Sequence, residues 1–131
     1  MSQESVEIVR AAIDAWNRCD IDAWIGAWDE QAEFYPVRAQ LEGRAYHGHE
    51  GLRRFVAEMA AEWEQVRFEV DEIRGAGEHV VALGRVRARR RARGVARDVP
   101  LALVGVVRGK KVVYSRCAAM SSRTARWASK G

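Results

Sequence analysis

The sequence predicts an α+β fold in which N-terminal helices pack on one face of a curved antiparallel sheet. Two observations carry this prediction. The part of the chain from Val66 to Met120 has the alternation and the Val and Leu content of strands, whereas the part before Val66 carries apolar residues at helical spacing. One face of an antiparallel sheet must be covered, and the helices supply the cover. The expected shape is a cone.

The C-terminal half divides into four expected strands joined by short turns. In the first of them Val66, Phe68 and Val70 alternate with charged residues, as they do in a strand with one buried face. The breaks contain glycine, which adopts turn conformations at low cost, and they fall at residues 75–77, 93–94 and 108–110. Three successive hairpins of this kind make an antiparallel meander.

The N-terminal half predicts three helices. The first runs from about Gln3 to Asn17, with an apolar stripe that ends at Trp16. Asp20 caps a short second helix, which Trp28 ends, and a third helix opens at Gly48 and runs to about Trp63. Two further segments lie between the second and third helices, a short strand over Ala32–Pro36 and a loop over Val37–Tyr46.

Length and composition indicate one folded domain. The chain has 131 residues, of which 48% are hydrophobic and 31% charged, so it has enough apolar content to fold. We expect the domain to occupy residues 1–120. The remaining segment, 121–131, is basic and polar, and we expect it to be poorly ordered unless Trp127 docks on the domain.

The charge and cysteine content bear on partners and compartment. Cys19 and Cys117 are too few for a disulfide framework and fit free thiols in a reducing cytoplasm. No apolar run approaches membrane-spanning length, so no membrane contact is expected. Seven arginines gather between residues 85 and 97 of a hairpin. They could bind nucleic acid, but no aromatic residue is interleaved for stacking, and we expect solvated side chains instead.

Three segments, Ala12–Trp24, Trp28–Phe34 and Gly48–Phe55, resemble the nuclear transport factor 2-like superfamily. Within it the sequence is most similar to the SnoaL-like group, which includes polyketide cyclases and ketosteroid isomerases. The resemblance extends over residues 4–117 and implies a cone with an apolar pocket between the helices and the concave sheet face. Fold and function are separate matters, because the same cone hosts isomerases, cyclases, hydrolases and binding modules.

The resemblance also implies which residues face the pocket, although each of them could equally serve as core packing. The set suits a small hydrophobic molecule. It comprises Trp16, Trp28, Phe34, Tyr46, Phe55, Met59, Leu103, Ser115 and Cys117, with Arg87 as a possible partner for a ligand carboxylate. Arg87 has that role only if its strand face is concave, and is otherwise a surface or interface residue.

The residues that catalyse ketosteroid isomerisation are missing from the matching positions. The tyrosine position holds Ala12, the general-base position falls at Pro36 or its neighbour, and the second acid falls near Leu103. That reaction needs a base and paired donors in an apolar cavity, so we reject it for this chain. The cyclase pattern favours an acid near the end of the last strand, and no Asp or Glu follows Asp98.

His49 remains the one catalytic candidate, as an acid or base oriented by Tyr46 or Arg87, because a histidine titrates near neutral pH. The alternative is that it only contacts the first turn of its helix. No phosphate loop, nucleophile elbow or dinucleotide fingerprint occurs, and the histidines lack zinc spacing, so we expect neither cofactor nor metal.

Two functional hypotheses therefore stand. The first is a pocket, catalytic or not, for a small hydrophobic metabolite. The second is a non-catalytic module that dimerises or binds a protein partner. An open cone with inward polar groups favours the first, and a cone filled by side chains favours the second. In either case we expect a homodimer formed through the convex sheet face.

Overall fold

The computed structural model describes residues 2–92 and 96–120, so the expected turn at 93–94 and the basic tail 121–131 lie outside the described residues. The elements follow one another in the order α1 (Ser2–Asn17), α2 (Ile21–Gly26), β1 (Trp28–Tyr35), α3 (Val37–Leu41), β2 (Tyr46–His47), α4 (Gly48–Glu62), β3 (Trp63–Ala76), β4 (His79–Arg90), β5 (Ala96–Arg108) and β6 (Lys111–Ala119). No helix in this described part is long and apolar enough to cross a membrane.

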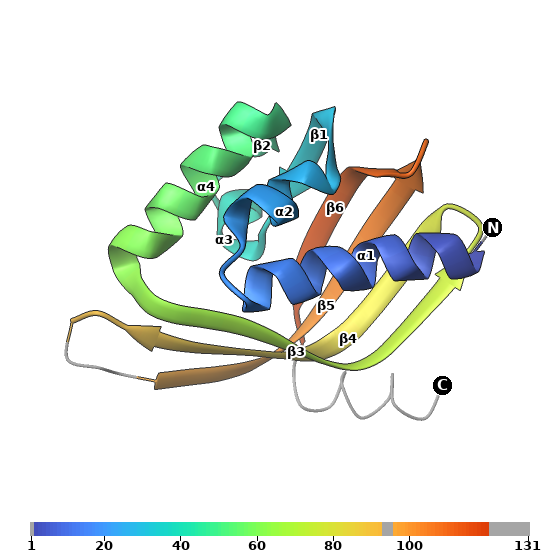
Figure 1. Cartoon of the computed structure of the whole chain (residues 1–131). Helices are drawn as coiled ribbons and strands as arrows, with labels where there is room; N and C mark the ends of the chain where they lie inside the picture. Colours follow the sequence, from blue (N-terminus) through green and yellow to red (C-terminus); the bar gives the residue numbers. More distant parts are fainter. Residues whose placement is uncertain (1, 93–95, 121–131) are drawn as a thin grey trace.

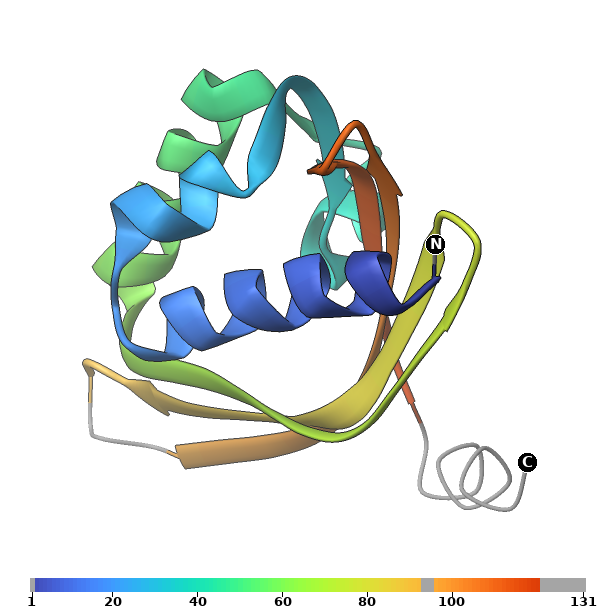
Figure 2. The same cartoon turned by 45° about the vertical axis from the view of Figure 1, so that its right-hand side comes forward.

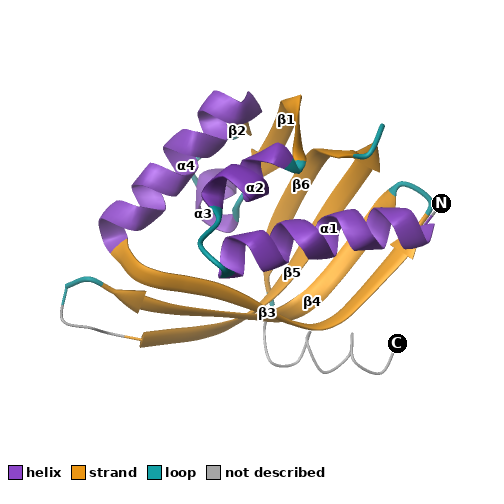
Figure 3. Cartoon of the chain, viewed as in Figure 1, coloured by secondary structure: helices purple, strands orange, loops and turns teal. Residues whose placement is uncertain are grey.

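The described strands form one six-stranded sheet in the order β2-β1-β6-β5-β4-β3. Strands β3 to β6 make the predicted antiparallel meander, and β1 joins β6 in parallel (Figures 1 and 3). The sheet bends strongly, and the helices of the described residues all lie on its concave side (Figure 2). The predicted α+β arrangement is thus confirmed.

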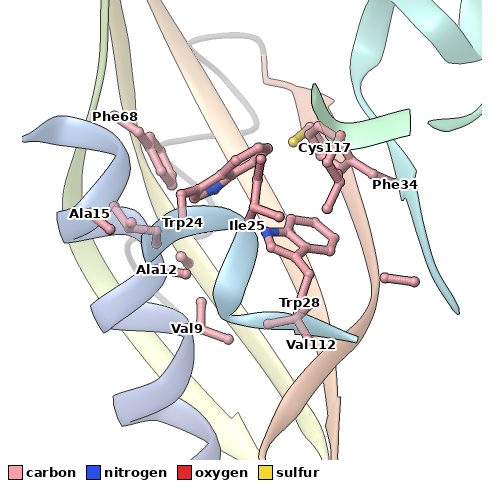
Figure 4. Packing of buried hydrophobic residues seen from close by; sticks show 14 of the residues in the cluster. Val9, Ala12, Ala15, Trp24, Ile25, Trp28, Phe34, Phe68, Val112 and Cys117 are labelled. Carbon is pink, nitrogen blue, oxygen red and sulfur yellow. The ribbon is translucent and has the colours of Figure 1, made fainter. Parts of the chain in front are cut away.

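Helix α1 lies across the concave face and contacts β3, β4 and β5. Its buried residues Val9, Ala12 and Ala15 point toward the sheet, and Trp24 of α2 packs beside them (Figure 4). Gly105 of β5 makes close approach of the helix possible, because a Cβ there would already lie 3.4 Å from a methyl group of Val9. The core therefore sits between α1, α2 and the sheet.

Two polar side chains at the end of α1 attach it to β3. The Asn17 amide donates to the carbonyl oxygen of Phe68 and accepts from its backbone N–H, both at 2.9 Å. The indole Nε1 of Trp16 donates to the carbonyl oxygen of Val66 at 3.0 Å. Strand β3 is the last strand of the sheet, so these contacts satisfy backbone groups on an edge that has no further strand to pair with.

The first strand begins earlier than the sequence predicted. Trp28 does not end the second helix but opens β1, which replaces the expected strand over Ala32–Pro36. Its backbone pairs with Val112 of β6, and Val112 N–H also donates to the carbonyl oxygen of Ala27. This pairing with a strand some 80 residues away overrides the polar local sequence, which gives little strand signal.

The segment predicted as a loop, Val37–Tyr46, contains the short helix α3 and the start of β2. Gln40 holds α3 in place, since its side-chain Nε2 donates to the carbonyl oxygens of Tyr35 at 2.8 Å and Cys117 at 2.7 Å. Those acceptors belong to β1 and β6. The stabilising contacts are therefore tertiary, which is why the local pattern did not reveal this helix.

The bend of the sheet includes an irregularity opposite Gly84. The register between β3 and β4 shifts between Val70 and Glu72, where one extra residue enters β3. A Cβ at Gly84 would overlap the carbonyl oxygen of Glu69 in β3. Glycine is therefore required here for close approach of the two backbones.

We predict that Gly84→Ala destabilises the fold by at least about 2 kcal/mol, because the overlap can be relieved only by moving backbone atoms of β3. The measurement is urea unfolding followed by circular dichroism. Gly26→Ala is the matched control, since a Cβ at Gly26 meets no atom within 4 Å. Equal unfolding midpoints for both variants would contradict the prediction.

Candidate functional site

The concave side of the sheet encloses a cavity of about 1160 Å³ that opens to solvent. All four helices and all six strands of the described sheet contribute residues to its wall. The apolar part of the wall combines the aromatic residues Trp16, Trp24, Phe34, Phe55, Trp63 and Phe68 with aliphatic residues that include Ile13, Met59, Val66, Val86, Leu101 and Leu103. A cavity of this size and composition can enclose a small organic molecule.

The aromatic side chains pack against one another and form a rigid wall. Phe55 of α4 stands edge-on to Phe34 of β1, with 4.9 Å between ring centroids, and lies 5.3 Å from the ring of Tyr46. Trp16 and Trp24 meet edge to face at 4.9 Å. Such contacts add to the packing energy and limit collapse of the wall into the cavity.

A phenol and a carboxylate meet at the cavity wall. The hydroxyl of Tyr46, a buried residue, donates a short hydrogen bond to Glu58 Oε1 on α4. Burial raises the pKa of the Tyr46 phenol above its usual value, and the hydrogen bond to Glu58 raises it further. The phenol therefore stays protonated at neutral pH and can act as a donor beside the carboxylate.

Charged side chains continue from this pair in a chain of contacts, which we call the mouth network. Arg44 lies 3.4 Å from the Tyr46 hydroxyl and binds Glu42, Glu42 lies 3.8 Å from Arg38, and Arg38 binds Glu62 at 2.8 Å. Glu62 also pairs with Arg90 at 3.3 Å. Every member lines the cavity, and the members are Glu58, Tyr46, Arg44, Glu42, Arg38, Glu62 and Arg90.

The contact between Arg44 and Glu42 shifts the pKa of each group so that its charged form is favoured. Arg44 holds the pKa of the Glu42 carboxyl below its usual value through a hydrogen bond, and Glu42 raises the pKa of the Arg44 guanidinium. Both groups thus remain charged at neutral pH. The pair of Glu42 and Arg44 links the segment that follows α3 to Tyr46 in the cavity wall.

Cys117 lines the cavity but is not equipped as a nucleophile. Burial raises the pKa of its thiol to about 12, so the reactive thiolate is scarce at neutral pH. The thiol therefore contributes an apolar surface to the cavity.

Most of the residues predicted to face a pocket do line the cavity: Trp16, Phe34, Tyr46, Phe55, Met59, Leu103 and Cys117. The structure places three others elsewhere. Trp28 lies in the closed core beside Trp24 and Phe34, and Ser115 is buried without reaching the cavity wall. Arg87 is exposed and pairs with Glu69 and Asp98. That any of these residues contacts a ligand stays a prediction.

The alternation of β4 explains the position of Arg87. Val80, Ala82 and Ala88 are buried on the concave side, so residues at odd positions of this strand face outward. Arg85 and Arg87 accordingly occupy the convex face, where both pair with Asp98 of the neighbouring strand. The alternative that the sequence left open, a concave position for Arg87, is not the one that the structure adopts.

His49 lies outside the cavity wall. Its Nε2 lies 2.7 Å from the carbonyl oxygen of Trp28, and since a carbonyl can only accept, this nitrogen donates the proton. The bond links the first turn of α4 to β1. A catalytic role for His49 stays a prediction, and the contact observed here is a structural one.

The acidic and basic residues of the mouth network, in particular Glu58, Glu62 and Arg90, were not predicted from the sequence. One signal was present. Glu58 and Glu62 are spaced four residues apart in the predicted third helix, and Glu58 directly precedes Met59, a predicted pocket residue, so Glu58 borders the pocket side of that helix. Arg38 and Glu42 could not be found, because they depend on the helix α3 that was predicted as a loop.

A curved sheet wrapped around helices, with a cavity on its concave side, defines the nuclear transport factor 2-like class of folds. A family model for the SnoaL-like domain matches residues 9–115, and the chain belongs to this family. The resemblance drawn from the sequence is thereby confirmed. A comparison with the curated proteins finds no match.

Solved structures show the same fold. A nuclear transport factor 2-like protein of unknown function from Burkholderia pseudomallei has a TM-score of 0.81 and 20% identity, covering 96% of this chain and 97% of its own. TerC, co-crystallised with polyporic acid, has a TM-score of 0.80 and 16% identity over 89% and 92%. A candidate SnoaL-like polyketide cyclase from a Jannaschia species has values of 0.78 and 19% over 90% and 86%.

Proposed function

We propose that this protein binds a small, largely apolar and planar molecule in the cavity. The observation that carries the proposal is the combination of an open cavity of about 1160 Å³, an aromatic wall and polar groups confined to one side of it. An open cone with inward polar groups is the feature expected of a ligand site, whereas a dimerisation module needs only a filled core. Ligands bound by structural relatives include polyporic acid in TerC, which supports a ligand of this general kind.

A cavity-filling variant tests the proposal. We expect flat aromatic or polyketide ligands to raise the melting temperature, because binding to the folded state at one hundred times Kd stabilises it by about 2.7 kcal/mol. Met59→Trp places a large side chain in the cavity and should abolish the shift. The measurement is a thermal-shift titration over a panel of such ligands.

The matched control is Ala57→Trp, which adds the same side chain to an exposed position of α4 that does not line the cavity. This variant should respond to ligands as the wild type does. A shift that survives in Met59→Trp, or no shift across the panel with the unchanged protein, would refute binding in the cavity.

A second candidate function, acid–base catalysis, is favoured by the pair formed by Tyr46 and Glu58. We propose that Glu58 accepts a proton from the bound molecule while the Tyr46 hydroxyl, which donates to Glu58 in this structure, turns to donate instead to an oxygen on which charge develops. Groups of this kind, placed in an apolar cavity, stabilise enolate-like transition states. Glu58 would supply the base that the ketosteroid isomerase positions of this chain lack.

The roles of Glu58 and His49 can be separated by variants. Once a substrate is known from the ligand panel, Glu58→Gln should lower kcat about 100-fold or more with little change in ligand affinity. Tyr46→Phe should also lower kcat. His49→Ala should leave kcat near the wild-type value if Glu58 is the base. The opposite result, loss with His49→Ala alone, would transfer the catalytic role to His49.

We further propose that a second copy of this chain covers the convex face. Half-buried apolar residues occupy its centre, with Leu83, Ala102 and Val104 facing outward on neighbouring strands and Val81 38% exposed. Tyr35 and Tyr114 pack together at the β1 side of the same face, 5.4 Å apart. A self-complementary patch of this kind suits a two-fold interface.

Val104→Glu should convert the dimer to a monomer, because it places two like charges in the centre of the interface. Sedimentation velocity measures the mass in solution. The exposed substitution Ala57→Glu, on the opposite side of the molecule, is the control. A monomeric wild-type protein, or an unchanged dimer in Val104→Glu, would contradict this proposal.

A further inference from the structure

The arginine-rich hairpin of β4 and β5 contributes two side chains to the cavity. The inward row of β4 continues from Val80 through Ala88 to Arg90, and the inward row of β5 continues from Leu103 back to Arg97. Both arginines line the cavity. Strand alternation thus separates them from Arg85, Arg87 and Arg89, which face outward.

Register brings the two inward arginines close together. Ala88 pairs with Arg97, and Arg90 follows Ala88 by two residues on the same face. Side chains in such diagonal positions of an antiparallel pair are separated by roughly 7–8 Å, within reach of two long side chains that bind one group. The two cations therefore mark one end of the cavity.

Nearby carboxylates do not neutralise these cations. Among the described residues Arg97 forms no ion pair, and Arg90 shares its one carboxylate partner, Glu62, with Arg38. Arg38 also lies 3.8 Å from Glu42, so two carboxylates accompany these three arginines, and Arg97 is bound to neither of them. On the convex face Arg85 pairs with Asp98, and Arg87 pairs with both Asp98 and Glu69, so each of these arginines has a carboxylate partner, which Arg97 lacks among the described residues.

The Arg90 side chain is 42% exposed, although its Nε is buried. The Nη2 atom of Arg90 lies 3.3 Å from Glu62. The guanidinium carbon Cζ lies 5.2 Å from the centroid of the Trp63 ring, and this contact fixes the position of the guanidinium. Its Nε is buried and has no hydrogen-bond partner among the described residues. The indole nitrogen of Trp28 is the other such group in the described chain, but it lies in the closed core.

We propose that Arg90 and Arg97, supported by Arg38, form a subsite for a carboxylate of the bound molecule, so that the ligand is an apolar organic acid. This proposal rests on the proposed ligand-binding function and specifies its ligand class. A guanidinium held on an aromatic ring, with donors unused and excess positive charge around it, binds a planar carboxylate with charge-assisted hydrogen bonds. The apolar body of the acid then lies against the aromatic wall.

The test compares two fluorescent probes with the same ring system and head groups of similar size, the charged anthracene carboxylate and the neutral anthracene carboxamide. The wild-type protein should bind the acid about tenfold more tightly than the amide, since charge-assisted hydrogen bonds are stronger than neutral ones. Added salt should weaken binding of the acid and leave binding of the amide unchanged. Fluorescence titration measures both affinities.

Variants locate the preference within the hairpin. Arg90→Gln should reduce the acid-to-amide ratio to near one, Arg90→Lys should restore part of it, and Arg97→Gln should reduce it. The neighbouring Arg89→Gln, which removes the same charge from the convex face, should leave the ratio unchanged. Circular dichroism and amide binding report whether each variant retains the fold and the cavity.

Each outcome decides between the proposals. Equal binding of acid and amide by the wild-type protein, or a preference that persists in Arg90→Gln and Arg97→Gln together, would overturn the carboxylate subsite while leaving the ligand cavity intact. Failure of both probes to bind would count against the cavity function and therefore against the subsite as well.

Discussion

The pairing of the Asn17 amide with the backbone of Phe68 is the contact on which the site depends. One side chain donates to and accepts from the same residue, so it fixes both the distance and the orientation of α1 relative to β3. The indole of Trp16 makes a second contact with β3, at the carbonyl oxygen of Val66. Val66, Phe68 and Trp16 also line the cavity, so three of the four residues in the anchoring contacts belong to its wall. Loosening them would change the width of the cavity directly.

The cavity stays open because the sheet bends and the ring system resists collapse. The bend needs Gly84, where the backbones of β3 and β4 come too close for any side chain. The rings that face the bend contact one another edge to face, and aromatic side chains have few rotamers through which to fill free space. Polar groups enter only at the mouth, where α3, α4 and the hairpin of β4 and β5 meet. The result is an apolar interior with charges at its entrance.

Much of this architecture could be predicted from the sequence, because the meander and the helical stripes are local patterns. The pocket residues followed from the resemblance, and most of them line the cavity. What failed depends on distant partners: Trp28 opens a strand because Val112 pairs with it, and α3 is held by Gln40 bonds to two strands. The arginine cluster shows the limit most clearly. Its composition is evident in the sequence, but only the register decides that Arg90 faces inward and Arg87 outward.

The mouth network has a kinetic consequence. Its ion pairs are exposed, with the Arg38 side chain 72% and the Glu42 side chain 44% accessible, and exposed pairs of this kind contribute less than about 1 kcal/mol each. Separating α3 from α4 therefore costs little compared with opening the anchored side of the cavity at β3. A ligand of the proposed kind would then enter and leave through the α3 side, on the fast timescale of surface segments. Selectivity for the proposed ligand would then come from its dissociation rate, because the entrance would exclude few molecules.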